Sequence, residues 1–295
     1  MIRTLFIIGN GFDLYLGIES SYSDFHRYMI KQWSDGVNLS NQLENFFPAL
    51  DNNGDSLLWS DFESALGKMD KDGVLEYCKL GFNIEDYDNI YRYVYDIEDS
   101  PSSFLTPVLF ELDECFHAWV NSLAIYGGDP TIPFFDRSAL YFSFNYTETL
   151  ENIYKVSENN ICHIHGKRHS SEKYIYGHNS EKDAILGDNS ADDNAFSKIE
   201  ECYLGLSKDC YKQIQNNKCF FDRIKESKIS RVVVYGCSLG EIDMPYFHEI
   251  KNNIPNTAEW HFSIYKKPED VNSVLNLIKA IGLNKNLCHT FDFRK

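Results

Sequence analysis

Short apolar runs bounded by turn residues recur along the chain and predict its β-strands. Seven such runs stand out: Thr4–Ile8, Ala139–Phe144, Ile161–Ile164, Lys173–Tyr176, Arg231–Tyr235, Trp260–Ile264 and His289–Phe293. They lack strict alternation of apolar and polar positions, which is typical of strands covered by helices on both faces of a parallel sheet. The pattern predicts an α/β protein with a Rossmann-like, mainly parallel sheet of about six strands flanked by helices.

The stretch between the first two runs has a helical pattern instead. Apolar residues recur at i, i+3 and i+4 across Phe104–Ala124, which predicts an amphipathic helix with Pro107 in its first turn. Residues 21–135 are therefore expected to form a large helical insertion, a cap, after the first strand. The α/β core is then made of residues 1–20 and 136–295.

Several helix ends and one loop can also be predicted. Ser60 and Glu63 have the spacing of a capping box, which marks a helix start. A final helix is expected to open at Pro268 and to end at Gly282. The segment Asp183–Asp193 is polar and rich in turn residues, which predicts a loop on the surface.

The charge of the chain restricts its partners. Its 28 Lys and Arg and 44 Asp and Glu give a formal net charge of −16. Such a field repels nucleic-acid backbones and anionic membranes, so it argues against a nonspecific nucleic-acid binder. The apolar content of 43% is ordinary for a globular protein.

No targeting or metal-binding pattern is evident. The first residues are too short an apolar run for a signal peptide, and no segment reaches the roughly 18 apolar residues needed to span a bilayer. The 8 cysteines include no CxxC pair, which argues against zinc ribbons and redox motifs. We therefore expect a cytoplasmic protein without a membrane partner and without a metal cofactor.

Polar or glycine-containing turns follow five of the predicted strands. These turns are Gly9-Asn10-Gly11-Phe12-Asp13, Asn145-Tyr146-Thr147, His165-Gly166, Gly177-His178 and Gly236-Cys237-Ser238. Because the carboxyl ends of parallel strands meet at one edge of a sheet, where ligands bind, the five turns together predict a ligand site. The first turn alone is ambiguous, because it lacks the third glycine of a dinucleotide fingerprint and no helix start is evident directly after it.

Two of these turns carry side chains suited to catalysis. Asn145 offers an amide that can hold a ribose hydroxyl or a water molecule, although Asn also suits a turn. His165 stands beside a glycine that leaves room for a ligand, and a histidine can accept a proton from a hydroxyl or a water near neutral pH. We treat these two residues as the candidate catalytic pair.

A metal site is an alternative use of the same region. His163 and His165 are two apart and lie on one face of a strand, and His178 and Asp13 would complete a set of four ligands. Two histidines alone rarely define a metal site, and we expect His163 to be structural.

Four motifs in order along the chain carry a resemblance to a known family. They are GNGFD followed by Gly17 and SSYSDF, then SFNYTETLE, then HIHG, then YGCSLGEIDMPYF. In this order, over nearly the whole chain, they resemble the AbiH family of bacterial phage abortive-infection proteins.

More distantly, the same landmarks are similar to the sirtuin-like NAD-binding fold, which also occurs in NAD-cleaving anti-phage effectors. That resemblance implies a cofactor-binding role for the first and the late glycine turns, at Gly9, Asn10, Gly11, Phe12, Asp13, Gly236 and Ser238. It implies that Asn145 and His165 act at the nicotinamide ribose. The chain lacks the cysteine zinc module and the GIPDFR-like loop of deacylase sirtuins, which argues against peptide deacylation. The charge of Asp13 does not suit a plain phosphate loop unless that residue contacts a ribose or caps a turn.

These observations lead to one preferred function and two alternatives. The preferred function is an anti-phage abortive-infection effector that binds NAD and hydrolyses it to nicotinamide and ADP-ribose, an NAD glycohydrolase. The first alternative is a sensor that binds a nucleotide or a phage-derived ligand without turnover, and the second is a metal-dependent hydrolase or nuclease. The expected partner is a small-molecule nucleotide, while a phage-derived trigger and self-association are left open.

Overall fold

A computed structural model describes residues 3–51, 54–126, 132–179, 191–265 and 268–293 of the chain. It divides into two compact units. The first contains Met1–Ser21, Val120–Ile175 and Asp209–Lys295, and the second contains Tyr22–Trp119 and Tyr176–Lys208. Within the described residues, no helix is long and apolar enough to cross a membrane.

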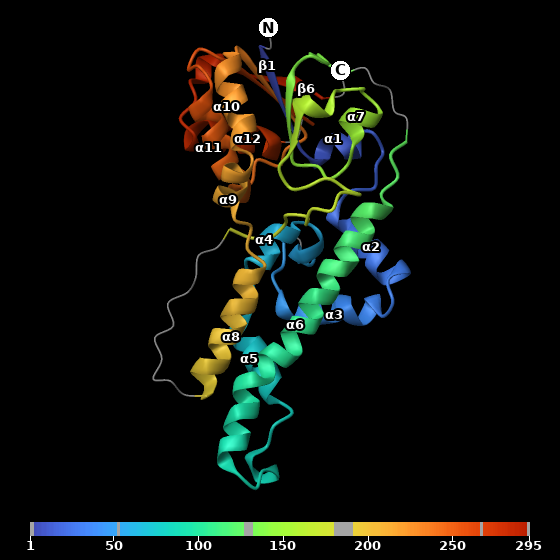
Figure 1. Ribbon diagram of the computed structural model, residues 1–295, viewed down its shortest axis with the longest axis vertical. Helices are drawn as coiled ribbons and strands as arrows, with labels where there is room; N and C mark the ends of the chain where they lie inside the picture. Colours follow the sequence, from blue (N-terminus) through green and yellow to red (C-terminus); the bar gives the residue numbers. More distant parts are fainter. Residues whose placement is uncertain (1–2, 52–53, 127–131, 180–190, 266–267, 294–295) are drawn as a thin grey trace. The chain divides into compact units, whose positions relative to one another are not determined.

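The first unit is built on a six-stranded sheet in which all paired neighbours are parallel (Figure 1). The strands are β1 (Thr4–Ile8), β2 (Leu140–Ser143), β3 (Ile161–His163), β4 (Arg231–Tyr235), β5 (Glu259–Ile264) and β6 (Cys288–Asp292). Their order across the sheet is β3-β2-β1-β4-β5-β6. The predicted α/β class and the number of strands are confirmed, and six of the seven predicted strands lie within a residue or two of their expected positions.

Both faces of the sheet are buried, as the apolar runs predicted. In β1, Leu5 and Ile7 belong to a core shared with the late helices, while Phe6 and Ile8 belong to a second core on the other face. The first face is covered by α9 (Cys210–Asn216), α10 (Lys218–Ser227), α11 (Met244–Asn253) and α12 (Pro268–Ala280). The second is covered by Phe12 and Leu150 of the short helices α1 (Asn10–Tyr15) and α7 (Thr149–Asn152), together with Tyr154. A fully buried sheet explains why its strands read as continuous apolar runs.

The second unit is helical. It consists of α2 (Tyr22–Gln32), α3 (Gly36–Phe46), α4 (Phe62–Leu66), α5 (Lys71–Lys79), most of α6 (Ile90–Ser122) and α8 (Ala191–Gly205). Its core is aromatic, with the ring of Phe25 packed against Phe62, Phe116 and Trp119 at centroid distances of 5.8, 5.3 and 5.1 Å. A buried ion pair joins Lys208 to Glu63 at 2.9 Å. The large helical insertion predicted after the first strand is therefore present.

The predicted strand Lys173–Tyr176 is wrong, because this segment forms no strand. One backbone hydrogen bond ties it to the turn after β3, where the Ile175 N–H donates to the His165 carbonyl at 2.9 Å. Tyr174 is buried through its side chain instead, with its hydroxyl donating to Asn121 Oδ1 at 2.8 Å. The apolar pattern of the segment therefore reflects the burial of the Tyr174 side chain and does not indicate a strand.

Three helix predictions need correction. A helix does follow the first glycine turn directly, since α1 begins at Asn10 with Gly9 as its N-cap. The helix near residue 60 is capped by Asp61, which accepts from the Ser64 N–H, because Ser60 donates its hydroxyl to Leu57 instead. The helix predicted to begin at Phe104 begins at Ile90 and holds both Pro101 and Pro107 in its interior.

The end of the chain agrees better with its prediction. The final helix α12 starts at Pro268, and Gly282 just beyond its end has φ of +66°, a conformation that favours glycine. The predicted loop Asp183–Asp193 lies outside the described residues up to position 190, and its last three residues begin α8.

Candidate functional site

The strand order places the candidate residues at the carboxyl ends of the strands, all at the same end of the sheet. The order β3-β2-β1-β4-β5-β6 reverses direction between β1 and β4, and ligands of open parallel sheets bind outside the carboxyl ends of the strands near such a reversal. The turn Gly9–Asp13 follows β1, and Gly236–Ser238 follows β4. Asn145 and His165 follow β2 and β3. All of these residues belong to the first unit.

The glycine turns after β1 and β4 pack directly on each other. The Gly9 N–H donates to the Tyr235 carbonyl and the Gly11 N–H to the Gly236 carbonyl, both at 2.8 Å. A Cβ atom on Gly9 would lie 2.7 Å from the Cα of Cys237, and one on Gly11 would lie 2.8 Å from the Cα of Gly236. These glycines are therefore required for the close approach of two backbones.

This packing limits what the first turn can offer a ligand. Besides the two glycine N–H groups, the Phe12 N–H is bonded to the Gly9 carbonyl at 2.9 Å. The Asn10 side chain is also engaged, since its amide donates to the Ser20 carbonyl at 2.8 Å and accepts from the Ser20 hydroxyl at 2.6 Å. A pyrophosphate would find these donors already used, and the predicted cofactor role of the turn stays a prediction.

Asp13 is held inside the protein. Its side chain is 1% exposed, and Oδ2 accepts a hydrogen bond from the Thr147 hydroxyl at 2.5 Å. Burial raises the pKa of Asp13, and this effect exceeds the opposing effects of Thr147, Thr149, the nearby Asn145 amide and His163. The carboxylate thus fastens the turn after β1 to the turn after β2.

Asn145 has a side chain that the fold does not satisfy. The residue is 6% exposed, yet neither Oδ1 nor Nδ2 makes a hydrogen bond of ordinary geometry. Its backbone is fixed, because the N–H donates to Ser143 Oγ at 3.2 Å and the carbonyl accepts from His163 Nδ1 at 2.9 Å. Besides its approach to Asp13, the amide makes no hydrogen bond of ordinary geometry. Because an unsatisfied buried amide costs free energy, its polar atoms are suited to hold a water or a ligand.

The register of β2 and β3 brings His165 and Asn145 to the same end of the sheet. Ser143 pairs with His163 across β2 and β3, and Asn145 and His165 each follow two residues after this pair. The imidazole of His165 is buried against the rings of Phe144, Tyr146 and Tyr246, at centroid distances of 5.2, 6.4 and 5.8 Å. The two predicted catalytic residues thus share one end of the sheet.

An acidic residue that the sequence analysis did not single out also reaches this place. Asp243 Oδ1 lies 3.8 Å from His165 Nε2. Asp243 ends the short 3-10 helix η4 (Glu241–Asp243) and is the N-cap of α11. The signal in the sequence is an acid two residues before Pro245, a spacing typical of a helix start.

The β4 turn offers one exposed polar side chain and one inert thiol. Ser238 is exposed, so its hydroxyl can contact a ligand. Burial, with a smaller effect of the Asp243 charge, raises the pKa of Cys237 well above its ordinary value. Because the thiolate is the reactive form of cysteine, Cys237 is not suited to be a nucleophile.

The histidines proposed as metal ligands have other roles. His163 donates to the Asn145 carbonyl through Nδ1, and its Nε2 faces Glu151 Oε1 at 3.1 Å. His178 belongs to the second unit, where its ring stacks on Tyr203 at 4.1 Å and Nε2 faces the Tyr203 carbonyl. Among the residues that the structure describes, no group of three or more His, Cys, Asp or Glu side chains is arranged to hold a metal ion.

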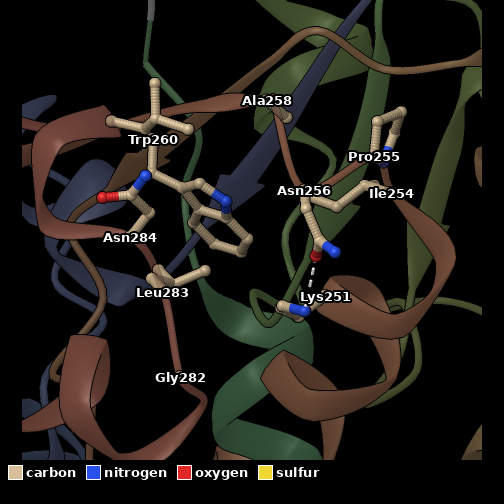
Figure 2. A pocket seen from close by; sticks show the side chains of 10 residues that line it. Lys251, Ile254, Pro255, Asn256, Ala258, Trp260, Gly282, Leu283 and Asn284 are labelled. Atoms are coloured by element: carbon tan, nitrogen blue, oxygen red, sulfur yellow. Dashed lines mark hydrogen bonds between the residues drawn. The ribbon is translucent and has the colours of Figure 1, made fainter.

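A pocket of about 280 Å³ lies away from these residues, where β5 and β6 begin (Figure 2). Its wall includes the Trp260 indole and Leu283, and Lys251 Nζ donates to Asn256 Oδ1 at its rim at 2.8 Å. No residue of the candidate site lines this pocket. It therefore adds nothing to the chemistry at the carboxyl ends of the strands.

Comparison with known proteins places the chain in a family. No curated protein and no solved structure gave a significant match. The family model described as bacteriophage abortive infection AbiH matches residues 5–264, which include β1 except its first residue, β2 to β5 and every candidate site residue. The chain therefore belongs to the AbiH family, whose description links it to abortive infection by bacteriophage.

Proposed function

We propose that this protein is an anti-phage effector that binds NAD and hydrolyses its N-glycosidic bond, releasing nicotinamide and ADP-ribose. The observation that carries the proposal is the placement of Asn145 and His165. Each comes two residues after the paired Ser143 and His163, at the carboxyl ends of neighbouring parallel strands, and the buried Asn145 amide has no hydrogen-bond partner of ordinary geometry. Family membership supports the anti-phage setting.

The reaction suits the groups present. The bond between the ribose C1′ and the nicotinamide nitrogen breaks, and its electron pair leaves with the nicotinamide, which departs as a neutral molecule. Water adds to C1′ and loses a proton. The enzyme must therefore stabilise an oxocarbenium-like ribose and position one water.

Each residue then has one task. Asn145 would hold a ribose hydroxyl or the attacking water through its amide, because neither Oδ1 nor Nδ2 makes a hydrogen bond of ordinary geometry. His165 would accept the proton from the water. Because the N–H groups of Gly9, Gly11 and Phe12 are already hydrogen-bonded within the protein, the pyrophosphate would need other donors. The exposed Ser238 hydroxyl is one such donor.

The test is incubation of the purified protein with NAD, with nicotinamide and ADP-ribose measured by mass spectrometry. Asn145→Ala and His165→Ala are expected to lower the rate by about 100-fold or more, as for the loss of a positioned acid–base or orienting group. His248→Ala, in an exposed position on α11, is the matched control and should leave the rate unchanged. Unchanged NAD in vitro and in phage-challenged cells that carry the wild-type protein would rule the proposal out.

The burial of the two candidate residues is also compatible with a second function, a nucleotide sensor without turnover. Asn145 and His165 are both buried, which suits recognition as well as catalysis. Calorimetry with NAD and other nucleotides separates the two functions. Tight binding with no product formed would favour the sensor, and it would leave a phage-derived ligand as the next compound to test.

A further inference from the structure

The side chain of Asp243 is directed toward the histidine of the site. Its Oδ1 lies 3.8 Å from His165 Nε2, and the two side chains are 19% and 5% exposed. The distance is too long for a hydrogen bond but is within the range of an ion pair. The contact joins the start of α11 to the turn after β3.

A role as a helix cap does not explain this carboxylate. An Asp at the N-cap ordinarily accepts a hydrogen bond from the N–H of the second or third helical residue. Here the second residue of α11 is Pro245, which has no N–H, and the Asp243 side chain makes no capping hydrogen bond. The position of Asp243 at the helix start therefore does not account for the direction of its carboxylate, which lies near His165.

The surroundings of His165 are such that a nearby negative charge would stabilise its protonated ring. Three aromatic rings pack around the imidazole, from Phe144 and Tyr146 after β2 and from Tyr246 in α11. Two of these rings belong to tyrosines, and the hydroxyl of one of them, Tyr146, donates to the Ile175 carbonyl. Asp243 brings a carboxylate near His165 Nε2. Burial among these rings destabilises the protonated, charged form of the imidazole, and a nearby carboxylate can offset this cost.

We propose that Asp243 is a positioning residue that orients His165 and stabilises the imidazolium formed when His165 accepts the proton of the attacking water. The inference rests on the proposed NAD hydrolysis. Asp243 does not itself touch the reacting atoms. Its effect is greatest after proton transfer, when the ring and the carboxylate carry opposite charges.

Asp243→Asn is the decisive variant, because Asn has nearly the same shape and is an equally good N-cap. The rate constant kcat for NAD hydrolysis is expected to fall about 10-fold or more, with KM within about twofold, as for an interaction made mainly in the transition state. The rising limb of the pH–rate profile should move to lower pH, because the imidazolium has lost its counter-charge. Glu241→Gln removes the same charge from an exposed position in the same 3-10 helix and should change neither.

A second measurement does not depend on catalysis. The pH midpoint of His165 protonation, followed by nitrogen-15 NMR without NAD and assigned with His165→Gln, should be lower in Asp243→Asn than in the wild type. Asp243→Glu should restore most of the difference. A midpoint that does not move in a folded Asp243→Asn protein would overturn the pairing, even if NAD is hydrolysed. A midpoint that moves in a protein without NAD turnover would support the pairing and refute the proposed function instead.

Discussion

Asp13 accepts a hydrogen bond from the Thr147 hydroxyl at 2.5 Å, and this contact joins the turn after β1 to the turn after β2. Thr147 is in turn 2.9 Å from the Thr149 hydroxyl at the start of α7. The carboxyl group of Asp13, which does not suit a phosphate loop, therefore points into the protein and holds the turn that contains Asn145 through Thr147. The carboxyl group of Asp13 thus helps to hold the two turns of the candidate site together.

Asp13→Asn is expected to stabilise the protein at neutral pH. Burial raises the pKa of Asp13 above its ordinary value of 3.8. At pH values above about 4, ionisation of this buried carboxyl group therefore lowers the free energy of unfolding. Asn removes this cost and still accepts a hydrogen bond from Thr147. Urea denaturation should show an unfolding free energy about 1 kcal/mol higher at pH 7, by the usual cost of a buried charged group, and the gain should vanish as the pH falls below about 4. A variant less stable than the wild type at pH 7 would show that the fold needs the charge.

Gly9→Ala tests the packing of the two glycine turns. The added Cβ would meet the Cα of Cys237 and the Gly236 carbonyl oxygen, each at 2.7 Å, and backbone atoms cannot move aside easily. We expect destabilisation by about 2 kcal/mol or more, as for overpacking of a tight site. Gly240→Ala is the matched control in the same region, because its nearest neighbour is Ser238 Oγ at 3.8 Å, and it should cost less than about 0.5 kcal/mol. Equal melting temperatures for the two variants would contradict the packing role.

The sequence predicted the sheet well because its strands are buried on both faces. Phe6 and Ile7 face different cores, so the β1 run is apolar throughout and stands out from its polar surroundings. The segment Lys173–Tyr176 looked similar for another reason, since Tyr174 is anchored by Tyr146 and Asn121. Local pattern cannot tell a strand from a loop that is anchored by its aromatic side chains, because the partner strand is a tertiary feature.

The site could be predicted only in part. Strand ends reveal Asn145 and His165 because a parallel sheet brings its carboxyl ends to one edge. The pairing of His165 with Asp243 joins positions far apart in the chain, and no local spacing reveals it. The same holds for Gly9 and Gly11, whose N–H groups suited a ligand in the sequence but are engaged by the β4 side in the structure.

Glu151→Gln should weaken the fold at neutral pH but not in acid. Burial alone would raise the pKa of Glu151, but the hydrogen bond and charge of His163, together with Lys167, bring it below its ordinary value of 4.5. A lowered pKa contributes stability above the ordinary value, and the contribution is lost as the pH falls through the folded value. Urea denaturation should show a loss of about 1 to 2 kcal/mol at pH 7, by the usual strength of hydrogen bonds to charged groups, and little difference near pH 3.

The control for this prediction is a neighbouring carboxylate that binds the same lysine. Glu158 contacts Lys167 at 3.1 Å but is 75% exposed, and exposed ion pairs contribute little. Glu158→Gln should therefore cost less than about 0.5 kcal/mol at any pH. If both variants lose the same stability, the effect belongs to Lys167 and not to the His163 pair.

Alkylation of cysteines should report whether the core of the first unit stays closed in solution. Burial raises the pKa of Cys162 to about 12, and its thiol lies against Asn217, whereas Cys219, the second residue of α10, is exposed. Iodoacetamide at pH 8 should label Cys219 rapidly in the folded protein and leave Cys162 unlabelled, because only an accessible thiolate reacts. In urea the two should react at similar rates. Since Cys162 precedes His163 in β3, rapid native labelling of Cys162 would mean that the strand leading to His165 opens readily, and the fixed geometry proposed for Asn145 and His165 would not hold.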